Sequence, residues 1–271
     1  MNKIILDGKN TRLIESDGFL KLDVLDHEKS LEVTDIKIDI EKDTDLYIET
    51  SGKDEKDNII INVYPKAKVN LYEFKTLGTH KFQYTYNMDK ESEIHVEKVY
   101  DINSNNEMTI MNLNGEKSKI DYVLKTVSES NEKYNFLVYH NGKNSISNII
   151  NNGVNILDGT LEFNVSGFVN RGVTGCDVNQ DNRILNLTRN FCVIEPNLFI
   201  DEYDVVANHA AHIGTFSEDS IFYLMSRGID QKTAENLLTK GFLLKGITKY
   251  TDELSEIINK YWRWYYAPWR F

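Results

Sequence analysis

Apolar and polar residues alternate with a period of two along most of the chain, from about residue 30 to residue 214. This alternation predicts short β-strands that bury one face and expose the other. The predicted strands recur roughly every 10 to 13 residues, which is typical of a sandwich, a barrel or a coiled β-solenoid. Clear examples are 46–49, 59–64, 69–74, 94–99, 120–127, 134–139 and 160–165.

The connections between these strands favour a solenoid. Asn and Asp are frequent at the strand ends, and no helical pattern interrupts the series. Asn114-Gly115 and Asn141-Gly142 are the candidates for a tight hairpin turn, and the series shows no strong hairpin signal beyond them. Periodicity alone still leaves a face-to-face sandwich open.

The pattern changes to a helical one at Ser217, which is followed by Glu218 and Asp219 as in a helix N-terminus. Apolar residues then recur at three- and four-residue spacing in three short segments, with Asp230 and Thr251 or Asp252 as the later starts. We therefore predict two parts, a β core over 1–216 and a helical region over 217–271. All three tryptophans lie in the last ten residues. This aromatic tail either packs back on the domain or forms a partner surface.

Composition narrows the function classes. The chain has 271 residues, 41% of them hydrophobic, and a formal net charge of −11. This acidic balance disfavours nucleic acid and anionic membranes as partners. No apolar run is long enough to span a bilayer, and Met1–Asp17 does not resemble a signal peptide, so we expect a cytoplasmic protein. Cys176 and Cys192 are then free thiols, either buried and inert or available to a metal or cluster.

The sequence lacks the common catalytic signatures. It has no P-loop, no G-x-G-x-x-G, no G-x-S-x-G, no H-E-x-x-H and no C-x-x-C. We therefore expect no enzyme, although each absence removes only one class. His209 and His212 are three residues apart, so on a strand they point to opposite faces, whereas on a helix or tight turn they could share a metal ion.

Four ordered sequence blocks lie between Gly159 and Phe242. The first block is Gln180-Asp181-Asn182-Arg183-Ile184-Leu185-Asn186-Leu187, and the second is Pro196-Asn197-Leu198-Phe199-Ile200. The third block contains Asp204, Val205, His209, Ala211 and Gly214. The fourth is Phe222-Tyr223-Leu224-Met225-Ser226-Arg227-Gly228-Ile229, with Ala234 and Gly241-Phe242 after it. In this order and spacing, the four blocks resemble the SufB/SufD family of iron–sulfur cluster assembly proteins.

The resemblance implies a right-handed parallel β-helix followed by C-terminal helices, in a short SufD-like form that lacks the N-terminal helical domain. It implies a scaffold that works with a SufC-like ABC ATPase, as a homodimer or as a heterodimer with a SufB/SufD-like protein. An iron–sulfur cluster would be held transiently at the dimer interface. The ATPase would dock on the helical region, for which we name Phe222, Tyr223, Leu224, Arg227, Gly228 and Phe242.

His209 is the candidate cluster residue, with Cys192, Cys176 and His212 as weaker candidates. The sequence departs from the family pattern at Ala207, where SufD relatives often carry cysteine, and at Ala210, where SufB relatives carry glutamate. Two alternatives therefore stay open. One is a structural paralogue that binds SufC without holding a cluster, and the other is a β-helix polysaccharide lyase or hydrolase.

Overall fold

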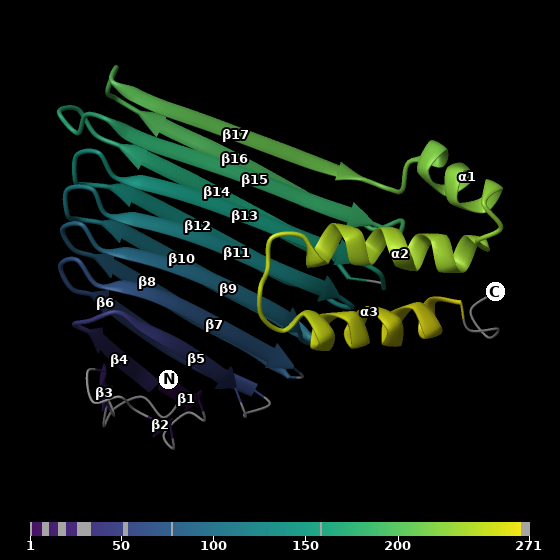
Figure 1. Cartoon of the computed structure of the whole chain (residues 1–271), viewed down its shortest axis with the longest axis horizontal. Coiled ribbons are helices and arrows are strands. Elements are labelled where there is room, and N and C mark those ends of the chain that lie inside the picture. Colours follow the sequence, from purple (N-terminus) through teal and green to yellow (C-terminus); the bar gives the residue numbers. More distant parts are fainter. Residues whose placement is uncertain are drawn as a thin grey trace.

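The strands coil into a flattened parallel β-solenoid built from two facing sheets (Figure 1). The computed structural model describes residues 2–6, 11–15, 20–25, 34–50, 54–76, 78–157 and 159–266. From β4 to β17, successive strands alternate between the two sheets, and neighbours within each sheet pair in parallel. The prediction of a parallel solenoid is therefore confirmed, and the sandwich alternative, which needs antiparallel sheets, is wrong.

The nine-stranded sheet holds the odd-numbered strands, except β3, together with β2. Its strands are β1 (Asn2–Leu6), β2 (Arg12–Glu15), β5 (Thr44–Thr50), β7 (Lys68–Thr76), β9 (Glu93–Asp101), β11 (Lys119–Ser128), β13 (Ile146–Asn155), β15 (Cys176–Asn186) and β17 (Val205–Gly214). The eight-stranded sheet holds β3 (Leu20–Leu25), β4 (Thr34–Ile40), β6 (Asp54–Val63), β8 (Thr79–Met88), β10 (Ser104–Leu113), β12 (Glu132–His140), β14 (Leu161–Val169) and β16 (Val193–Ile200).

The two ends of the solenoid differ. At the N-terminal end, β2 pairs antiparallel with β1, and β3 pairs antiparallel with β4. At the C-terminal end, β17 and β16 are the last strands of their sheets, and no described strand pairs with their outer edges. In the described part of the chain, strand direction therefore reverses at the N-terminal end of the solenoid, and the strand edges are open at its C-terminal end.

The core lies between the sheets and follows from the period-two pattern. Every second side chain of a strand points inward, so that Ile94 and Val96 of β9 stack on Ile120 and Tyr122 of β11. All four side chains are buried. Adjacent rungs place similar side chains at the same depth, which gives one continuous apolar column.

Three helices follow the last strand: α1 (Glu218–Ser226), α2 (Gln231–Leu244) and α3 (Thr251–Tyr265). The Asp230 side chain caps α2 by accepting a hydrogen bond from the backbone N–H of Thr233 at 3.0 Å. No helix in the described part of the chain has both the length and the apolar character needed to cross a membrane.

Helices α2 and α3 cover the outer face of the nine-stranded sheet near the C-terminal ends of its strands (Figure 1). Val99, Val123 and Val154 form the apolar patch on the sheet. The helical side chains that bury this patch are Leu243, Leu254, Ile257, Ile258, Tyr261 and Trp262. Since helices this short are marginal alone, burial of this stripe on the sheet is what stabilises them.

A buried carboxylate attaches the loop between α2 and α3 to the sheet. Glu97 of β9 accepts hydrogen bonds from the backbone N–H groups of Thr248 and Lys249 at 2.8 and 3.0 Å. Its Oε1 lies 2.9 Å from Nε2 of His95. Burial acts to raise the pKa of Glu97, but the hydrogen bonds from His95, Thr248 and Lys249 outweigh it and lower this pKa.

The aromatic tail packs back where the structure describes it. The Trp262 side chain is only 2% exposed, and the rings of Tyr265 and Tyr266 contact it. The side chain of Trp264 and residues 267–271, which include Trp269, lie outside the described residues.

Candidate functional site

His209 lies on β17, at the open end of the solenoid. It pairs in register with Gln180, which pairs with the buried Ile149 of β13, so the His209 side chain belongs to the inward-facing column. His212 pairs with Arg183 and points to the outer face of the same sheet. The two histidines therefore lie on opposite faces of one strand and share no metal ion. The described residues contain no group of three metal-binding side chains.

Polar side chains occupy the inward positions below His209. Gln180 is 4% exposed and Asn182 is fully buried. Gln180 Nε2 donates to the backbone carbonyl of Asn197 at 3.3 Å, and Asn151 Nδ2 donates to Asn182 Oδ1 at 2.7 Å. The solenoid interior is therefore polar next to the open end. Neither Gln180 nor Asn182 was among the predicted site residues, although both lie in the first family block.

The two cysteines lie away from each other at opposite ends of the parallel strands. Cys176 begins β15, is 2% exposed, and has its Sγ 3.4 Å from Oγ of Ser145. Cys192 is half-buried beside Asn155, the last residue of β13, which donates to its Sγ at 3.4 Å. Burial raises the pKa of the Cys192 thiol, which disfavours the thiolate that binds iron. The structure does not bring either sulfur next to His209.

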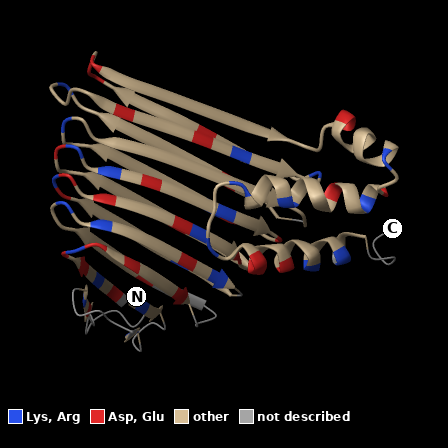
Figure 2. Ribbon diagram, viewed as in Figure 1, with Lys and Arg blue, Asp and Glu red and all other residues tan. Residues whose placement is uncertain are grey.

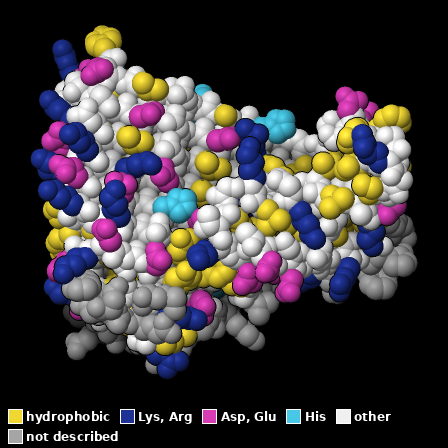
Figure 3. Space-filling model, in the orientation of Figure 1, with side chains coloured by type: hydrophobic (Ala, Val, Ile, Leu, Met, Phe, Trp, Pro, Cys, Tyr) yellow, Lys and Arg dark blue, Asp and Glu magenta, His cyan; other side chains and the backbone are white. Residues whose placement is uncertain are grey.

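Helix α1 projects away from the solenoid and buries none of its residues (Figure 1). Phe222 is 74% exposed and Tyr223 is 54% exposed. The Arg227 guanidinium lies 4.6 Å from the centre of the Tyr223 ring. Gly228 ends the helix in the left-handed region with a φ of 84°. Figure 3 shows hydrophobic side chains gathered over α1 and α2.

The predicted docking residues do not form one surface. Leu224 is half-buried, whereas Phe242 packs into the contact between the helices and the sheet. Phe242 also lines a cleft of about 220 Å³ between the end of the sheet and the helices, together with His212 and Arg183. Phe222 and Tyr223 therefore form an exposed apolar face on α1, whereas Phe242 lies in the contact between α2 and the sheet.

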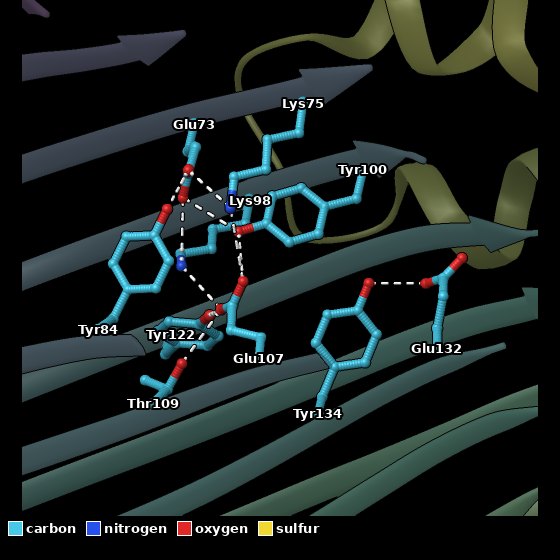
Figure 4. A network of polar contacts seen from close by, with 10 residues as sticks. All are labelled: Glu73, Lys75, Tyr84, Lys98, Tyr100, Glu107, Thr109, Tyr122, Glu132 and Tyr134. Carbon is cyan, nitrogen blue, oxygen red and sulfur yellow. Dashed lines mark hydrogen bonds and ion pairs between the residues drawn. The ribbon is translucent and has the colours of Figure 1, made fainter. Parts of the chain in front are cut away.

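A network of four buried charges lies inside the solenoid, several rungs away from His209 (Figure 4). Glu73, Lys75 and Lys98 come from the nine-stranded sheet and Glu107 comes from the eight-stranded one. Lys98 Nζ lies 3.1 Å from Glu73 and 3.0 Å from Glu107. Lys75 Nζ lies 3.3 Å from Glu73 and 3.6 Å from Glu107.

The network is neutral overall and closed to solvent, because all four side chains are at most 1% exposed. Burial acts to raise the pKa of Glu73, but Lys75 and Lys98 outweigh it and lower this pKa to about 2. The network links the two sheets, because Glu107 of the eight-stranded sheet pairs with Lys75 and Lys98 of the nine-stranded sheet. The sequence contains a signal for this network that the predictions did not use. Glu73 and Lys75 occupy inward positions of β7 and continue the alternation that Val69 and Leu71 begin.

The sequence of the solenoid and of the helices that follow it matches a known protein family. Residues 26–242 match the family described as "SUF system FeS cluster assembly, SufBD core domain". This match covers most of the chain.

Curated relatives agree with the family match. The chain is 36% identical over 116 residues to the iron–sulfur cluster assembly protein SufD of Bacillus subtilis, a match that covers 42% of this chain and 26% of that protein. It is 41% identical over 78 residues to an iron–sulfur cluster assembly SufBD family protein of Mycobacterium leprae, covering 28% of this chain and 20% of the relative. The aligned segments thus span about a quarter or less of these relatives.

The family match extends from the region before β4 to the second helix, across the solenoid and its open end. It includes the four sequence blocks and the strand that carries His209. The chain therefore belongs to the SufBD core domain family of the SUF iron–sulfur cluster assembly system.

Proposed function

We propose that this chain is a non-catalytic scaffold component of iron–sulfur cluster assembly. In this proposal it works with a SufC-like ABC ATPase and with a second SufB/SufD-like protomer. The observation that carries the proposal is the position of His209 on β17, the last strand of the solenoid, whose outer edge pairs with no described strand. A histidine at that edge can share a ligand set with a second chain.

The cluster is the cargo of this site. A nascent iron–sulfur cluster needs several thiolate or imidazole donors. His209 offers one imidazole, but Ala207 and Ala211, its neighbours on the same face of β17, offer none. One chain therefore supplies too few ligands, and a second protomer has to complete the set. This requirement favours a cluster held transiently between two subunits.

The edge of β17 suits such a second protomer. Edge strands that must stay unpaired usually carry charges, especially lysine, whereas β17 carries no Lys, Arg, Asp or Glu (Figure 2). The backbone groups along its outer edge, which no described strand covers, can accept another strand by β-strand addition. The second protomer is either another copy of this chain or a SufB/SufD-like paralogue.

Substitution of His209 tests the proposal. In the complex with the ATPase and the second protomer, His209→Ala should lower cluster affinity by about 10-fold or more, because a ligand is lost. The measurement is anaerobic reconstitution followed by iron and sulfide analysis and visible absorption spectroscopy. His209→Cys is the matched control, since a thiolate restores a ligand at the same place and should restore the cluster. Equal cluster content in the parent and in His209→Ala would remove His209 from the site.

We propose that the ATPase docks on α1. A helix with no buried residue gains little from the rest of the fold, and its exposed Phe222 and Tyr223 with Arg227 are the side-chain types that dominate protein interfaces. The chain has no P-loop, so the energy of nucleotide hydrolysis would have to come from such a partner.

A double substitution on α1 tests this docking surface. Phe222→Ala with Tyr223→Ala should weaken ATPase binding by about 10-fold or more, as interface aromatics do, without changing the unfolding temperature of the chain. Calorimetry with the purified ATPase gives the affinity. Tyr203→Ala, which removes a fully exposed aromatic just before β17, is the control and should bind like the parent. Full affinity in the double variant would place docking elsewhere.

The cysteine positions favour a second candidate function. Cys176 is buried and Cys192 is half-buried, and neither lies beside His209. A paralogue that binds the ATPase but holds no cluster would show this arrangement. Reconstitution of the complete complex distinguishes the two functions: a cluster that depends on His209 supports the scaffold, and a complex that forms but stays colourless supports the cluster-free paralogue.

A further inference from the structure

A buried glutamine lies next to His209 on the inner face of the nine-stranded sheet. Gln180 of β15 pairs in register with His209 of β17, so the two side chains leave adjacent parallel strands on the same face. Neighbouring strands lie about 4.8 Å apart, which is within the reach of a glutamine side chain. Gln180 is only 4% exposed, so its amide lies inside the last turn of the solenoid.

The facing sheet leaves room for this glutamine. Gly167 occupies a buried, inward position of β14. A β-carbon added at Gly167 would lie 3.3 Å from Nε2 of Gln180 and 3.0 Å from Cγ1 of Val178, both closer than ordinary van der Waals contact. The missing side chain at Gly167 therefore provides the space into which the Gln180 amide extends.

One end of the Gln180 amide is fixed by the opposite sheet. Its Nε2 donates to the backbone oxygen of Asn197 in β16 at 3.3 Å. A carbonyl oxygen only accepts hydrogen bonds, so the amide atom that faces Asn197 has to be the nitrogen, and the other has to be the oxygen. Since β16 is the last strand of its sheet, this bond draws the amide towards the end of the solenoid that carries His209.

The other end of the amide is an unused acceptor. Gln180 Oε1 is buried and has no hydrogen-bond partner among the residues that the structure describes. A buried acceptor that stays unpaired is costly, and buried amide oxygens are therefore nearly always paired. We thus expect a donor beside this oxygen.

His209 is the neighbour that can supply the donor. Its inward neighbours on β17, Ala207 and Ala211, have no polar side-chain atom. Asn182 lies on the same face of β15, but its Nδ2 is also without a partner in the described structure, so it does not satisfy Gln180. An imidazole carries at least one N–H in either protonation state.

We infer that Gln180 Oε1 accepts a hydrogen bond from one ring N–H of His209, and that this bond presents the other ring nitrogen, with its lone pair, at the open end of the solenoid. This inference rests on the proposed function, in which His209 is a ligand of the cluster. It adds the residue of the same chain that positions this ligand.

A hydrogen bond of this kind determines what the imidazole can do. A neutral imidazole carries its proton on one nitrogen and its lone pair on the other. Histidines that bind metals almost always donate their N–H to an oxygen acceptor, which fixes the ring orientation and raises the basicity of the free nitrogen. A carboxamide oxygen provides this acceptor and, unlike a carboxylate, adds no charge inside the solenoid. Gln180 therefore suits the role of a positioning residue.

The tautomer of His209 tests the hydrogen bond without any cluster. Nuclear magnetic resonance of the full chain, with isotope-labelled histidine, gives the ring-nitrogen shifts at about pH 9, where an ordinary imidazole is neutral. The signal that is lost in His209→Gln identifies the residue. Gln180→Met keeps the length of the side chain but has no oxygen. It should change the ratio of the two His209 tautomers by about 5-fold towards that of a free imidazole, the effect of one lost hydrogen bond.

Three further variants make this result specific. Gln180→Glu keeps an oxygen acceptor of the same reach and should keep the parent tautomer. Asn182→Leu removes the other unpartnered amide, which lies in register with Ala211, and should leave the tautomer unchanged. Gly167→Ala leaves Gln180 in the chain but crowds its amide, so it should shift the ratio in the same direction as Gln180→Met. Circular dichroism and thermal unfolding check that each variant is folded.

The same variants link the hydrogen bond to the cluster. In the complex with the ATPase and the second protomer, Gln180→Met should lower cluster affinity by about 10-fold or more, as loss of the hydrogen bond behind a histidine ligand does. Gln180→Glu should restore most of this affinity, and Asn182→Leu should behave like the parent. Anaerobic reconstitution with iron and sulfide analysis gives the affinities.

The outcomes separate this inference from the proposed function. An unchanged tautomer in folded Gln180→Met and Gly167→Ala would overturn the inference, even where His209→Ala abolishes the cluster and the scaffold function stands. A shifted tautomer with a cluster that does not depend on His209 would support the hydrogen bond and remove the proposed function. A shifted tautomer together with weaker cluster binding in Gln180→Met supports the hydrogen bond and its positioning role.

Discussion

Replacement of Glu107 by glutamine should lower the free energy of unfolding by about 3–5 kcal/mol, because it leaves buried charge uncompensated. In the parent, Glu73 and Glu107 balance Lys75 and Lys98 in a space with no access to water (Figure 4). Glu107→Gln keeps the shape of the side chain but leaves two ammonium groups against one carboxylate. Chemical denaturation followed by far-ultraviolet circular dichroism measures the loss.

Two further variants make this result specific. Glu162→Gln breaks the surface pair with Lys133, whose atoms lie 2.8 Å apart, and should cost at most about 1 kcal/mol. Adding Lys98→Met to Glu107→Gln removes one charge of each sign and should recover part of the lost stability. If the two substitutions instead simply add, the four charges do not act as one balanced network.

Ionisation of Glu132 should subtract stability from the parent protein between pH 4.5 and pH 7.5, while His140, whose pKa burial lowers to about 4, acts in the opposite direction over the same range. Burial raises the pKa of Glu132 to about 7, from the value of 4.5 expected in the unfolded chain. A group whose pKa is raised by folding stabilises the fold fully below its unfolded pKa, and this contribution is lost as the pH rises through the folded pKa. The difference corresponds to about 3 kcal/mol by linkage.

Glu132→Gln isolates this effect. The acceptor oxygen that receives the hydroxyl groups of Tyr134 and Thr126, at 2.6 and 2.7 Å, is kept in the amide, but the ionisation is removed. The unfolding free energy of the variant minus that of the parent should therefore rise by about 3 kcal/mol from pH 4.5 to pH 7.5. All other titrating groups are common to both proteins. A constant difference across this range would show that Glu132 does not titrate in the fold near pH 7.

The sequence was sufficient for the strands from β4 onwards, for the three helices and for the general architecture, but not for β1, β2 and β3, which lie before the predicted series. Period two predicts the strands, and the apolar stripes after Ser217 predict α1, α2 and α3. Periodicity could not choose between a sandwich and a solenoid, because both bury every second residue. The family blocks supported the solenoid, and the parallel register of β4–β17 shows it. Residue His209 falls on a strand, and its face follows from its register with Gln180.

Polar groups in buried places were the part that could not be predicted. A lysine such as Lys98 at an inward position contradicts the rule that inward residues are apolar, and only partners from other strands explain it. Which residues become partners depends on the pairing register between strands, and the sequence of one strand does not specify that register. One set of outer-face hydrogen bonds had a usable signal. Asn148 donates to Asp121, Asn179 donates to Asn148 and Asn208 donates to Asn179, and the partners are 27, 31 and 29 residues apart, the length of one full turn of the solenoid.

Because successive strands alternate between two sheets, the solenoid can gain or lose whole turns in its middle while the strands at its ends stay the same. Each added turn would contribute one strand to each sheet and would contact only its immediate neighbours. Insertions or deletions of a whole turn between β4 and β8 would therefore leave β17 and α1 unchanged, whereas a change that affects β7 would disturb the contact of Phe74 with Tyr250 in the α2–α3 loop. Relatives could differ in overall span while preserving the geometry of the C-terminal end of the solenoid. Selection on length and selection on assembly can then proceed separately within one fold.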